Sequence, residues 1–404
     1  MLVVGAGLAA AQTVAELREA GFDGRVRVLG AEGLPPYDRP PLSKHLLDRP
    51  APAWLKDEVG IDVTALADEV RLGLPARGLL PGGPRPAVLT DAGWTSADDV
   101  VVATGAHAVR VAGWDAACTL HTAADAQRLR DALRPGARLV VVGAGWVGAE
   151  VAGVAAAAGH EVTVLEAGPA PLAGALGERV GGLTSRWYDE AGVHLVTQAR
   201  VVAVHPDRVD LAGGRSVRAD VVLAAVGARP TTAWLGRALP VGQDGSLRVD
   251  EAFRVLDRSA QQAVPHVWAV GDVARRASRR HGTVPGGHWD GALRGPRVLV
   301  GHLVGRPVPP PADDPAPYVF STQLGHDLAL FGVPGSRDEV LLRGDPHAGT
   351  GWSAVWLAGE RATAVLVVDR PREVAAARRL FAGEQLPLVD RAAAADPQTP
   401  LRAR

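Results

Sequence analysis

A glycine-rich turn close to the start of the chain constrains the fold more than any other sequence feature. Residues 2–4 are apolar, Gly5-Ala-Gly-Leu-Ala-Ala10 follows them, and Val14 and Leu17 then share one helical face before Gly21. Apolar residues at this spacing, ended by a glycine, are typical of a helix. The segment is therefore predicted to form a short strand, a tight turn and a helix.

The residues on either side of this turn indicate what it binds. A second β-rich segment, residues 25–29, leads to Glu32, which lies 27 residues after Gly5. In a dinucleotide-binding βαβ unit, the first glycine makes the tight turn and the second lets a pyrophosphate approach the helix N-terminus. Gly5 and Gly7 stand at these positions, the small Ala10 lets helix and strand pack closely, and Glu32 can accept hydrogen bonds from a ribose.

The same pattern occurs a second time. Arg138-Leu-Val-Val-Val142 leads into Gly143-Ala-Gly-Trp-Val-Gly148, and a helix over residues 149–158 and a strand over residues 161–165 are predicted before Glu166. A carboxylate at this position suits a free 2′-hydroxyl and repels a 2′-phosphate, which favours NAD over NADP. A structural turn is the alternative, but all positional requirements are met together. Two such sites imply two dinucleotides, and FAD with NADH fits this pair.

The composition limits how such a protein can carry out redox chemistry. Cys118 is the only cysteine, which excludes an intrachain disulfide, a CxxC pair and a cysteine-rich metal site. A bound cofactor must therefore carry any electrons, and no metal is predicted. The formal net charge of −1 does not indicate a nucleic acid or an anionic membrane as partner. No apolar run reaches the ~18 residues that span a bilayer, and we expect a cytoplasmic protein, monomeric by default.

Lysine is the other rare residue type. Lys44 and Lys56 are the only lysines among 43 basic residues. A compact ammonium and a planar guanidinium are not interchangeable in a closely packed contact. A lysine retained in an arginine-rich chain can therefore mark a functional position, and an incidental surface lysine is the alternative.

Seven segments in the same order carry a resemblance over nearly the whole chain. They are the Gly5 motif, residues 34–44, residues 101–106, the Gly143 motif, and residues 226–230, 270–274 and 320–323. Arg-Pro-Pro-Leu-Ser-Lys, which ends at Lys44, is the most specific string. Together they resemble the FAD-dependent ferredoxin reductases of bacterial oxygenase systems, a group that includes putidaredoxin reductase, dioxygenase reductase components and rubredoxin reductases.

This resemblance implies an α/β fold with two Rossmann-like dinucleotide-binding domains, similar to glutathione reductase, and an α+β C-terminal domain. The 404 residues suffice for several domains. The implied FAD-binding domain is discontinuous, the NAD-binding domain is inserted into it, and the reductase domain ends the chain: residues 1–109 with 241–310, residues 110–240, and residues 311–404. The proline-rich residues 306–317 have the composition of a stiff linker. Beyond it, three strands and a helix are predicted over residues 338–342, 352–357, 361–368 and 372–381.

The resemblance also implies two catalytic residues. Lys44 is expected near flavin N5, where an ammonium stabilises the negative charge of reduced flavin, and Arg39 belongs to the same wall. Glu150 stands in a Gly-x-Glu pattern, which in the family points a carboxylate at the nicotinamide pocket and can pair with the lysine. The alternative for Glu150 is an acid in the first turn of a helix, favoured by the helix dipole.

Further cofactor-binding residues follow from the same segments. Asp272 matches the aspartate that accepts hydrogen bonds from the FAD ribitol, and Gly271 lets the backbone approach the cofactor. Trp289 and Phe320 are candidate neighbours of the flavin ring, but each can equally be a core aromatic. The full predicted set is Gly5, Gly7, Ala9, Ala10, Glu32, Arg39, Lys44, Ala76, Thr104, Gly105, Gly143, Gly145, Val147, Gly148, Glu150, Glu166, Gly227, Gly271, Asp272, His288, Trp289 and Phe320.

The activity implied is hydride transfer from NADH to flavin N5, after which single electrons leave to a ferredoxin-type carrier that serves an oxygenase. Ferredoxins are acidic, so the carrier is expected to dock on basic residues. The densest basic cluster follows Asp272 and consists of Arg275, Arg276, Arg279 and Arg280. A solvated loop in an arginine-rich chain is the alternative.

Other functions are compatible with parts of the pattern. A non-catalytic or redox-sensing FAD- and NAD-binding interaction protein has the same architecture, although Lys44 and Glu150 favour the enzyme. Thiol-using relatives such as NADH oxidase need a flavin-facing cysteine, which residues 37–44 lack. The chain departs from the family pattern at Gly287, where a glutamate is usual, at residues 107–109 and at Ala170. Gly287 affects a contact expected with the flavin, and Ala170 is a further argument against NADP as the coenzyme.

Overall fold

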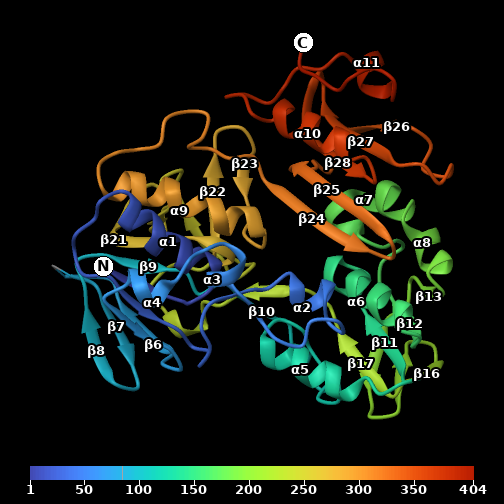
Figure 1. Ribbon diagram of the computed structural model, residues 1–404, viewed down its shortest axis with the longest axis horizontal. Coiled ribbons are helices and arrows are strands. Elements are labelled where there is room, and N and C mark those ends of the chain that lie inside the picture. Colours follow the sequence, from blue (N-terminus) through green and yellow to red (C-terminus); the bar gives the residue numbers. More distant parts are fainter. Residues whose placement is uncertain (84) are drawn as a thin grey trace.

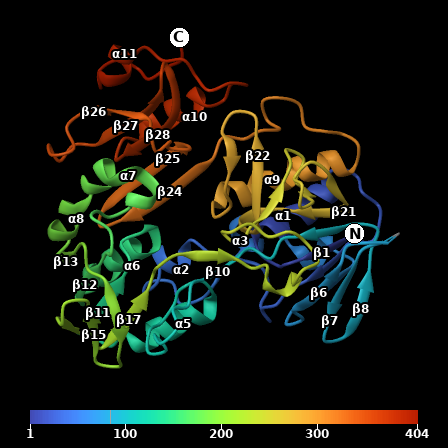
Figure 2. The same cartoon turned by 180° about the vertical axis from the view of Figure 1, so that it is seen from behind.

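The computed structural model describes residues 1–83 and 85–404, and Figure 1 shows its elements in three groups. The first group combines the start of the chain, in blue, with later residues in orange, the second is mostly green, and the third, in red, contains the C-terminus. Seen from behind in Figure 2, the red group again lies against the green one. None of the helices in the described part of the chain is long and apolar enough to cross a membrane.

A nine-stranded sheet forms the first group, in the order β23-β22-β19-β20-β21-β9-β1-β2-β5. Its strands are β1 (Leu2–Val4), β2 (Arg27–Leu29), β5 (Glu69–Arg71), β9 (Val100–Val102), β19 (Leu247–Val249), β20 (Arg254–Leu256), β21 (Ala263–Ala269), β22 (Ala274–Ser278) and β23 (Gly282–Val284). The five strands from β21 to β5 are parallel. Two segments far apart in sequence, residues 1–102 and 247–284, therefore build one sheet.

The first predicted strand, turn and helix are confirmed. Helix α1 (Leu8–Glu19) packs against α9 (Trp289–Leu303), with Val14 and Leu17 fully buried, and Gly21 follows its end with a φ of +77°. The strand predicted from residue 25 starts two residues later. The reason is local, because the N–H of Val26 donates to the Asp68 carboxylate and not to a neighbouring strand.

The second group contains the second copy of the motif. Its four parallel strands lie in the order β13 (Val193–Val196), β12 (Glu161–Leu165), β11 (Arg138–Val142) and β17 (Val221–Ala224). The two predicted strands have the predicted bounds. Helix α6 (Trp146–Ala157) begins three residues earlier than predicted, because Gly145 already serves as its N-cap. Helix α5 (Ala123–Ala132) lies in the same group and begins with a capping box of Thr122 and Asp125.

Two short strands connect the first and second groups. β10 (Ala106–Ala108) pairs antiparallel with β18 (Ala228–Pro230), so that Ala106 lies opposite Pro230. β10 begins at the last residue of the segment 101–106 and β18 ends the segment 226–230, close to the two ends of the predicted domain 110–240. The two passages of the chain between the first and second groups are therefore hydrogen-bonded to one another.

The third group is an antiparallel sheet in the order β24 (Tyr318–Gln323), β25 (His326–Gly332), β28 (Arg361–Val368), β27 (Trp352–Ala358) and β26 (Glu339–Arg343). Helices α10 (Pro371–Leu380) and α11 (Arg391–Ala395) follow it. The three predicted strands and the helix are present, each within one residue at either end. β24 and β25 were not predicted as strands. β25 is an inner strand of the sheet, and its last five residues are all buried, so its sequence lacks an alternating pattern.

Shorter elements complete the chain. They are β3 (Tyr37–Asp38), α2 (Pro41–Lys44), β4 (Ala53–Trp54), α3 (Leu55–Glu58), α4 (Val63–Leu66), β6 (Ala76–Leu80), β7 (Ala87–Thr90), β8 (Gly93–Ser96), α7 (Ala173–Gly182), α8 (Ser185–Glu190), β14 (Val201–Val204), β15 (Arg208–Leu211), β16 (Ser216–Arg218) and two single helical turns, Ala233–Leu235 and Gly271–Val273.

One hydrophobic core joins the second group to the third. It includes Leu42 of α2, Val151 of α6, Leu324 after β24 and Trp352 of β27. The first group has a separate core around β1, β9 and β21. The junction of α2, α6 and β24 is therefore a packed contact between three parts of the chain.

Candidate active site

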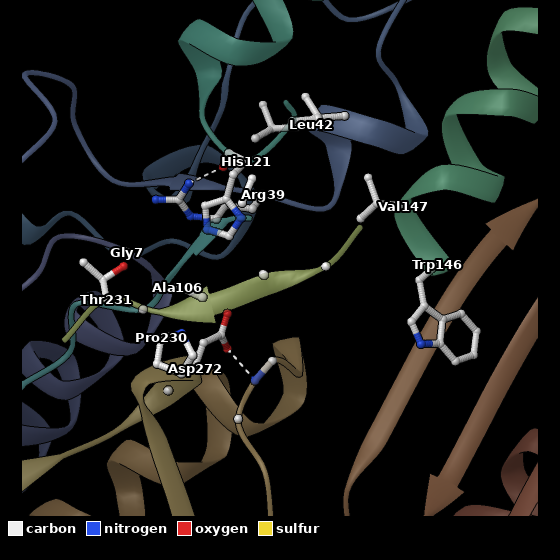
Figure 3. Close-up of a pocket in the computed structure, with 18 of the residues that line it drawn as sticks. Gly7, Arg39, Leu42, Ala106, His121, Trp146, Val147, Pro230, Thr231 and Asp272 are labelled. Carbon is white, nitrogen blue, oxygen red and sulfur yellow. Dashed lines mark hydrogen bonds between the residues drawn. The ribbon is translucent and has the colours of Figure 1, made fainter. Parts of the chain in front are cut away.

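A cavity of about 1330 Å³ runs between the two motif-bearing sheets and reaches β24. Figure 3 shows Gly7 of the first motif on one side of it and Trp146 and Val147 of the second on the other. All of the predicted cofactor-binding residues line it, except Ala10 and Gly148. The structure therefore brings together residues from seven separate sequence segments.

The two exceptions, Ala10 and Gly148, stand where helix and strand pack against each other. Ala10 is 1% exposed, inside the first core. A Cβ on Gly148 would lie 2.1 Å from the carbonyl oxygen of Gly143. Both positions are small because helix and strand approach each other there, which is the third requirement of the motif.

The first glycines of the two motifs have equivalent geometry. Gly5 has a φ of +125°, and a Cβ there would lie 2.1 Å from the oxygen of Ala103. Gly143 has a φ of +106°, and a Cβ would lie 2.5 Å from the oxygen of Ala225. In each sheet, the motif's turn therefore passes directly over the end of the neighbouring strand, which leaves no room for a side chain.

The second glycines leave the helix N-termini open. Gly7 and Gly145 are the N-caps of α1 and α6, neither cap makes a side-chain hydrogen bond, and a Cβ on either would meet nothing within 4 Å. The first N–H groups of a helix lack partners within the helix and carry the positive end of its dipole. Two such ends on one cavity suit two pyrophosphate groups.

The acid after the first motif is held by two neighbours. Glu32 accepts hydrogen bonds from the Tyr37 hydroxyl at 2.6 Å and from the Arg39 guanidinium at 2.8 Å. Burial raises the pKa of Tyr37 to about 12, so it donates as a neutral phenol. Arg39 also donates to the carbonyl of His121, as the dashed line in Figure 3 shows. The carboxylate is thus fixed at the cavity wall.

The acid after the second motif is bound to backbone. Glu166 accepts hydrogen bonds from the N–H of Ala144 at 2.8 Å and of Gly168 at 2.7 Å. A carboxylate has about four acceptor positions, so two remain for a ligand. Glu166 therefore places a fixed negative charge at the end of β12, on the cavity.

The Asp272 segment closes the first half of the cavity. Asp272 accepts a hydrogen bond from the N–H of Gly287, drawn in Figure 3, at 3.0 Å. A Cβ on Gly286 would lie 2.6 Å from the backbone carbonyl oxygen of Asp272, and Gly287 has a φ of +96°. At the position where the family usually has glutamate, this chain thus contributes a left-handed backbone and its amide. Burial lowers the pKa of the adjacent His288.

Lys44 and Glu150 meet inside the cavity, as the resemblance implied. The Lys44 ammonium lies 2.6 Å from the Glu150 carboxylate, whose side chain is only 4% exposed. Lys44 also lies over the Phe320 ring, 5.0 Å from its centroid. The alternative, an acid in the first turn of the helix, does not hold, because α6 begins at Trp146 and has no acidic residue in its first turn.

Trp289 and Phe320 both face the cavity, as expected of neighbours of the flavin ring. Their rings meet edge to face at 6.0 Å, and both are partly exposed. The Trp289 indole donates to Asp38 at 2.7 Å, and burial raises the pKa of Asp38. Both therefore belong to the cavity wall, and Trp289 also packs against the first core.

Several lining residues were missed from the sequence. Asp38, Ser43, His121, Trp146, Arg200 and Tyr318 also face the cavity. Asp38 and Ser43 stand within the segment 34–44 that carries the resemblance, so their position was a usable signal. His121, Arg200 and Tyr318 lie outside every motif, and only the packing of distant segments brings them to the site.

The predicted docking cluster is not a surface of four free arginines. The side chains of Arg276 and Arg280 are only 6% and 4% exposed, and both pair with the buried carboxylate of Asp314. Arg275 pairs with Asp244, and Arg279 pairs with Asp313. The prediction was wrong for Arg276 and Arg280, because acids 34 or more residues later fold back onto them.

The single cysteine is not among the residues that line the cavity. Cys118 bridges to Leu223 of β17, and burial raises the pKa of its thiol. No cysteine occurs among the described residues that line the cavity. Within residues 1–83 and 85–404, no three His, Cys, Asp or Glu side chains are grouped so as to hold a metal.

Comparison with known proteins places this geometry in a family. A family model described as pyridine nucleotide-disulphide oxidoreductase matches residues 1–291. The chain belongs to this family. A second model, described as reductase C-terminal, matches residues 318–404.

Individual relatives cover almost the whole chain. The anthranilate 1,2-dioxygenase system ferredoxin–NAD(+) reductase component of Burkholderia cepacia is 33% identical and covers 99% of this chain and 98% of its own. The crystal structure of Fdr9 superposes with a TM-score of 0.88 at 39% identity, with 100% and 99% coverage. A covalent complex of putidaredoxin reductase with putidaredoxin gives 0.81 at 25% identity, with 94% and 92% coverage.

Proposed function

We propose that this protein is an NADH-dependent flavoprotein reductase that passes electrons through FAD to a ferredoxin-type carrier serving an oxygenase. The observation that carries the proposal is the convergence of two open helix N-termini and the Lys44–Glu150 pair on one cavity. Its relatives are named as reductase components of oxygenase systems. The covalent complex of putidaredoxin reductase with putidaredoxin supports a ferredoxin-type protein as the acceptor.

The residues around the first motif fit FAD. The open N-terminus of α1 would receive its pyrophosphate, Glu32 a ribose, and Asp272 the ribitol, with Ala9, Ala76, Thr104 and Gly105 along the wall. When bound, FAD takes two electrons from a hydride donor and releases them singly. Lys44, Trp289 and Phe320 surround the part of the cavity where the two halves meet, and would enclose the ring.

The residues around the second motif fit NADH. The N-terminus of α6 would receive its pyrophosphate, Glu166 its adenosine ribose, and Val147 and Gly227 line the same half. Glu150, two residues after Gly148, points toward Lys44 and so toward the first half. The chain's own part in the reaction is to hold the two reactants in line and to place a positive charge at their meeting point.

We also propose the domain division predicted from the resemblance. Residues 1–109 with 241–310 would bind FAD, residues 110–240 NADH, and residues 311–404 form the reductase C-terminal domain. The division is supported by the sheets, since β1 and β21 share one sheet while β11, β12, β13 and β17 form another. The pairing of β10 with β18, where the chain passes between the two units, also supports the division.

A direct test is anaerobic mixing of the purified protein with NADH. The protein is expected to be yellow and to lose its visible flavin absorbance within seconds. It should then reduce members of a panel of ferredoxins and rubredoxins, which identifies the acceptor. A colourless preparation, or bleaching over hours, contradicts the reductase and instead indicates a nucleotide-binding interaction protein.

The fixed charge of Glu166 is expected to set the preference for NADH. Glu166→Gln keeps the shape and one acceptor oxygen but removes the charge that repels a 2′-phosphate. The ratio of kcat/KM for NADH to that for NADPH is expected to fall about tenfold, measured by steady-state ferricyanide reduction. Glu161→Gln, on the same strand but exposed and outside the cavity lining, is the control. An unchanged ratio in Glu166→Gln would show that the charge does not select the coenzyme.

Of the four arginines predicted to dock the carrier, Arg275 and Arg279 remain candidates. Each keeps an exposed guanidinium, but each is already paired with an aspartate. Replacing both by glutamate is expected to raise the KM for an acidic ferredoxin two- to threefold at low salt, and less as salt is added. Arg215→Glu, an exposed residue of the second group, is the control. Equal KM values in both variants would exclude this docking surface.

A further inference from the structure

Glu150 receives hydrogen bonds from three parts of the chain. Lys44 and Ser43 of α2 donate at 2.6 and 2.5 Å, and Ser321 of β24 donates at 2.5 Å. Glu150 itself stands on α6. We propose that the C-terminal domain completes the reducing site through Ser321, a positioning residue that holds the Glu150 carboxylate against Lys44. The inference rests on the proposed function and adds a third domain to its site.

The hydrogen bonds to the Glu150 carboxylate are important because that carboxylate is buried. Glu150 is 4% exposed, Ser43 5% and Ser321 2%. A buried carboxylate loses its hydration, and hydrogen bonds from the protein must replace it. Two serine hydroxyls and one ammonium supply that replacement, and hydrogen bonds with a charged partner are about twice as strong as bonds between neutral groups.

The direction of the Ser321 bond is set by its own neighbour. The side-chain amide of Gln323, also buried, donates to the Ser321 oxygen at 3.1 Å. Because this bond uses an acceptor position of Ser321, the hydroxyl hydrogen is left for Glu150. The order of donation therefore runs from Gln323 to Ser321 to Glu150. This gives a role to two residues of the Phe-Ser-Thr-Gln segment that no cofactor contact explains.

Consecutive residues of β24 contact the two members of the ion pair. Ser321 bonds to Glu150, and the ring of Phe320 lies under the Lys44 ammonium. The titratable groups facing Glu150 are Lys44 from α2 and, through Lys44, Asp38; the contacts from β24 are uncharged. The strand thus orients the pair without adding a charge to it.

A glycine on α6 sets how closely β24 approaches. Gly153 stands one helical turn after Glu150, and a Cβ there would lie 2.7 Å from the backbone nitrogen of Leu324. That nitrogen belongs to backbone, which cannot swing aside as a side-chain end can. A methyl group at residue 153 must therefore push the end of β24 away from α6, and with it Ser321 away from Glu150.

The test compares flavin reduction by NADH in stopped flow, under anaerobic conditions, in the full chain loaded with FAD. Ser321→Ala is expected to lower the limiting rate about tenfold, with the NADH concentration for half-maximal rate unchanged within about twofold. Ser321→Thr, which keeps the hydroxyl, is expected to restore the rate. Thr322→Ala is the matched control, because Thr322 is an exposed residue of β24 whose hydroxyl donates to Asp327 of β25 and not to Glu150.

A double-mutant cycle separates positioning through Glu150 from a general structural effect. In a Glu150→Gln background, Ser321→Ala is expected to slow reduction no further. Should Ser321→Ala fail to retain FAD, Gly153→Ala is compared with Ser321→Thr, and the inference requires the first to be slow and the second near wild type. Wild-type rates in Ser321→Ala, equal slowing by Thr322→Ala, or additive losses in the cycle overturn it. Failure of the wild type itself to be reduced rejects the proposed function instead.

Discussion

Replacing Lys44 by methionine is expected to lower the rate of flavin reduction by NADH about 100-fold or more, the usual cost of losing one charged group aimed at a developing charge. Methionine keeps much of the length and apolar stem of lysine but removes the ammonium. The Glu150 carboxylate would then lose the ion pair at 2.6 Å while staying buried. The measurement is the limiting rate in anaerobic stopped flow.

The chain provides a matched control for this variant, because it has one other lysine. Lys56 is 69% exposed and pairs with Asp62 at the surface, outside the cavity lining. Lys56→Met therefore removes the same charge and is expected to leave the rate unchanged. Equal slowing in both variants would mean that the overall charge, and not the position of Lys44, matters. A normal rate in Lys44→Met would remove Lys44 from the mechanism.

Replacing Asp314 by asparagine is expected to reduce the free energy of unfolding by about 3–5 kcal/mol, the range for breaking a buried ion pair by removing one partner. Asp314 is 1% exposed and accepts from Arg276 at 2.6 Å, from Ser278 at 3.0 Å and from the backbone N–H of Arg280 at 3.3 Å. Without its charge, two buried guanidinium groups face each other. Urea unfolding followed by circular dichroism measures the loss.

The adjacent aspartate is the control for Asp314. Asp313 pairs with Arg279, whose side chain is 47% exposed, so Asp313→Asn is expected to cost about 1 kcal/mol or less. Similar losses for the two variants would show that burial does not distinguish them. The consequence for the fold is specific, because Asp314 ties the proline-rich residues 306–317 to β22. This stretch was predicted as a stiff linker, and the structure anchors it to the first group.

The same carboxylate implies a pH dependence. Burial by itself raises the pKa of Asp314, but Arg276, Ser278 and Arg280 outweigh it and hold that pKa below its ordinary value. The folded state therefore binds this proton less readily than the unfolded chain does. The stabilisation is complete above the unfolded pKa of about 3.9 and is lost as the pH falls below it. In Asp314→Asn, this contribution to acid unfolding is expected to disappear.

The two nucleotide-binding motifs could be predicted in detail because their geometry is local. The turn at Gly5 and the one at Gly143 each depend on a strand, a glycine with positive φ and a helix within about twenty residues of chain. The predicted bounds of β11 and β12 were correct for the same reason. Even the start of α6 was missed by only three residues, because a glycine can serve as N-cap as well as turn.

The roles of Lys44 and Glu150 came from the resemblance and not from spacing. These residues stand 106 positions apart, and nothing in either local pattern indicates that they meet. Ser321, 171 residues from Glu150, was named only as part of a motif, with no role. Trp289 and Phe320 remained undecided between core and cavity until their surroundings were visible.

The arginine cluster shows most clearly what local sequence patterns cannot predict. Four arginines within six residues read as one basic surface, yet two of them are buried on Asp314 and all four are paired. Strand, turn and helix follow from near neighbours, whose hydrogen bonds and steric limits are the same wherever the segment lies. Which charges are buried, and which groups meet in the cavity, depends on loops of 30 to 170 residues closing. The contact between Lys44, Glu150 and Ser321 depends on how α2, α6 and β24 pack together. Gly153, which has no side chain, sets the distance between α6 and β24 there.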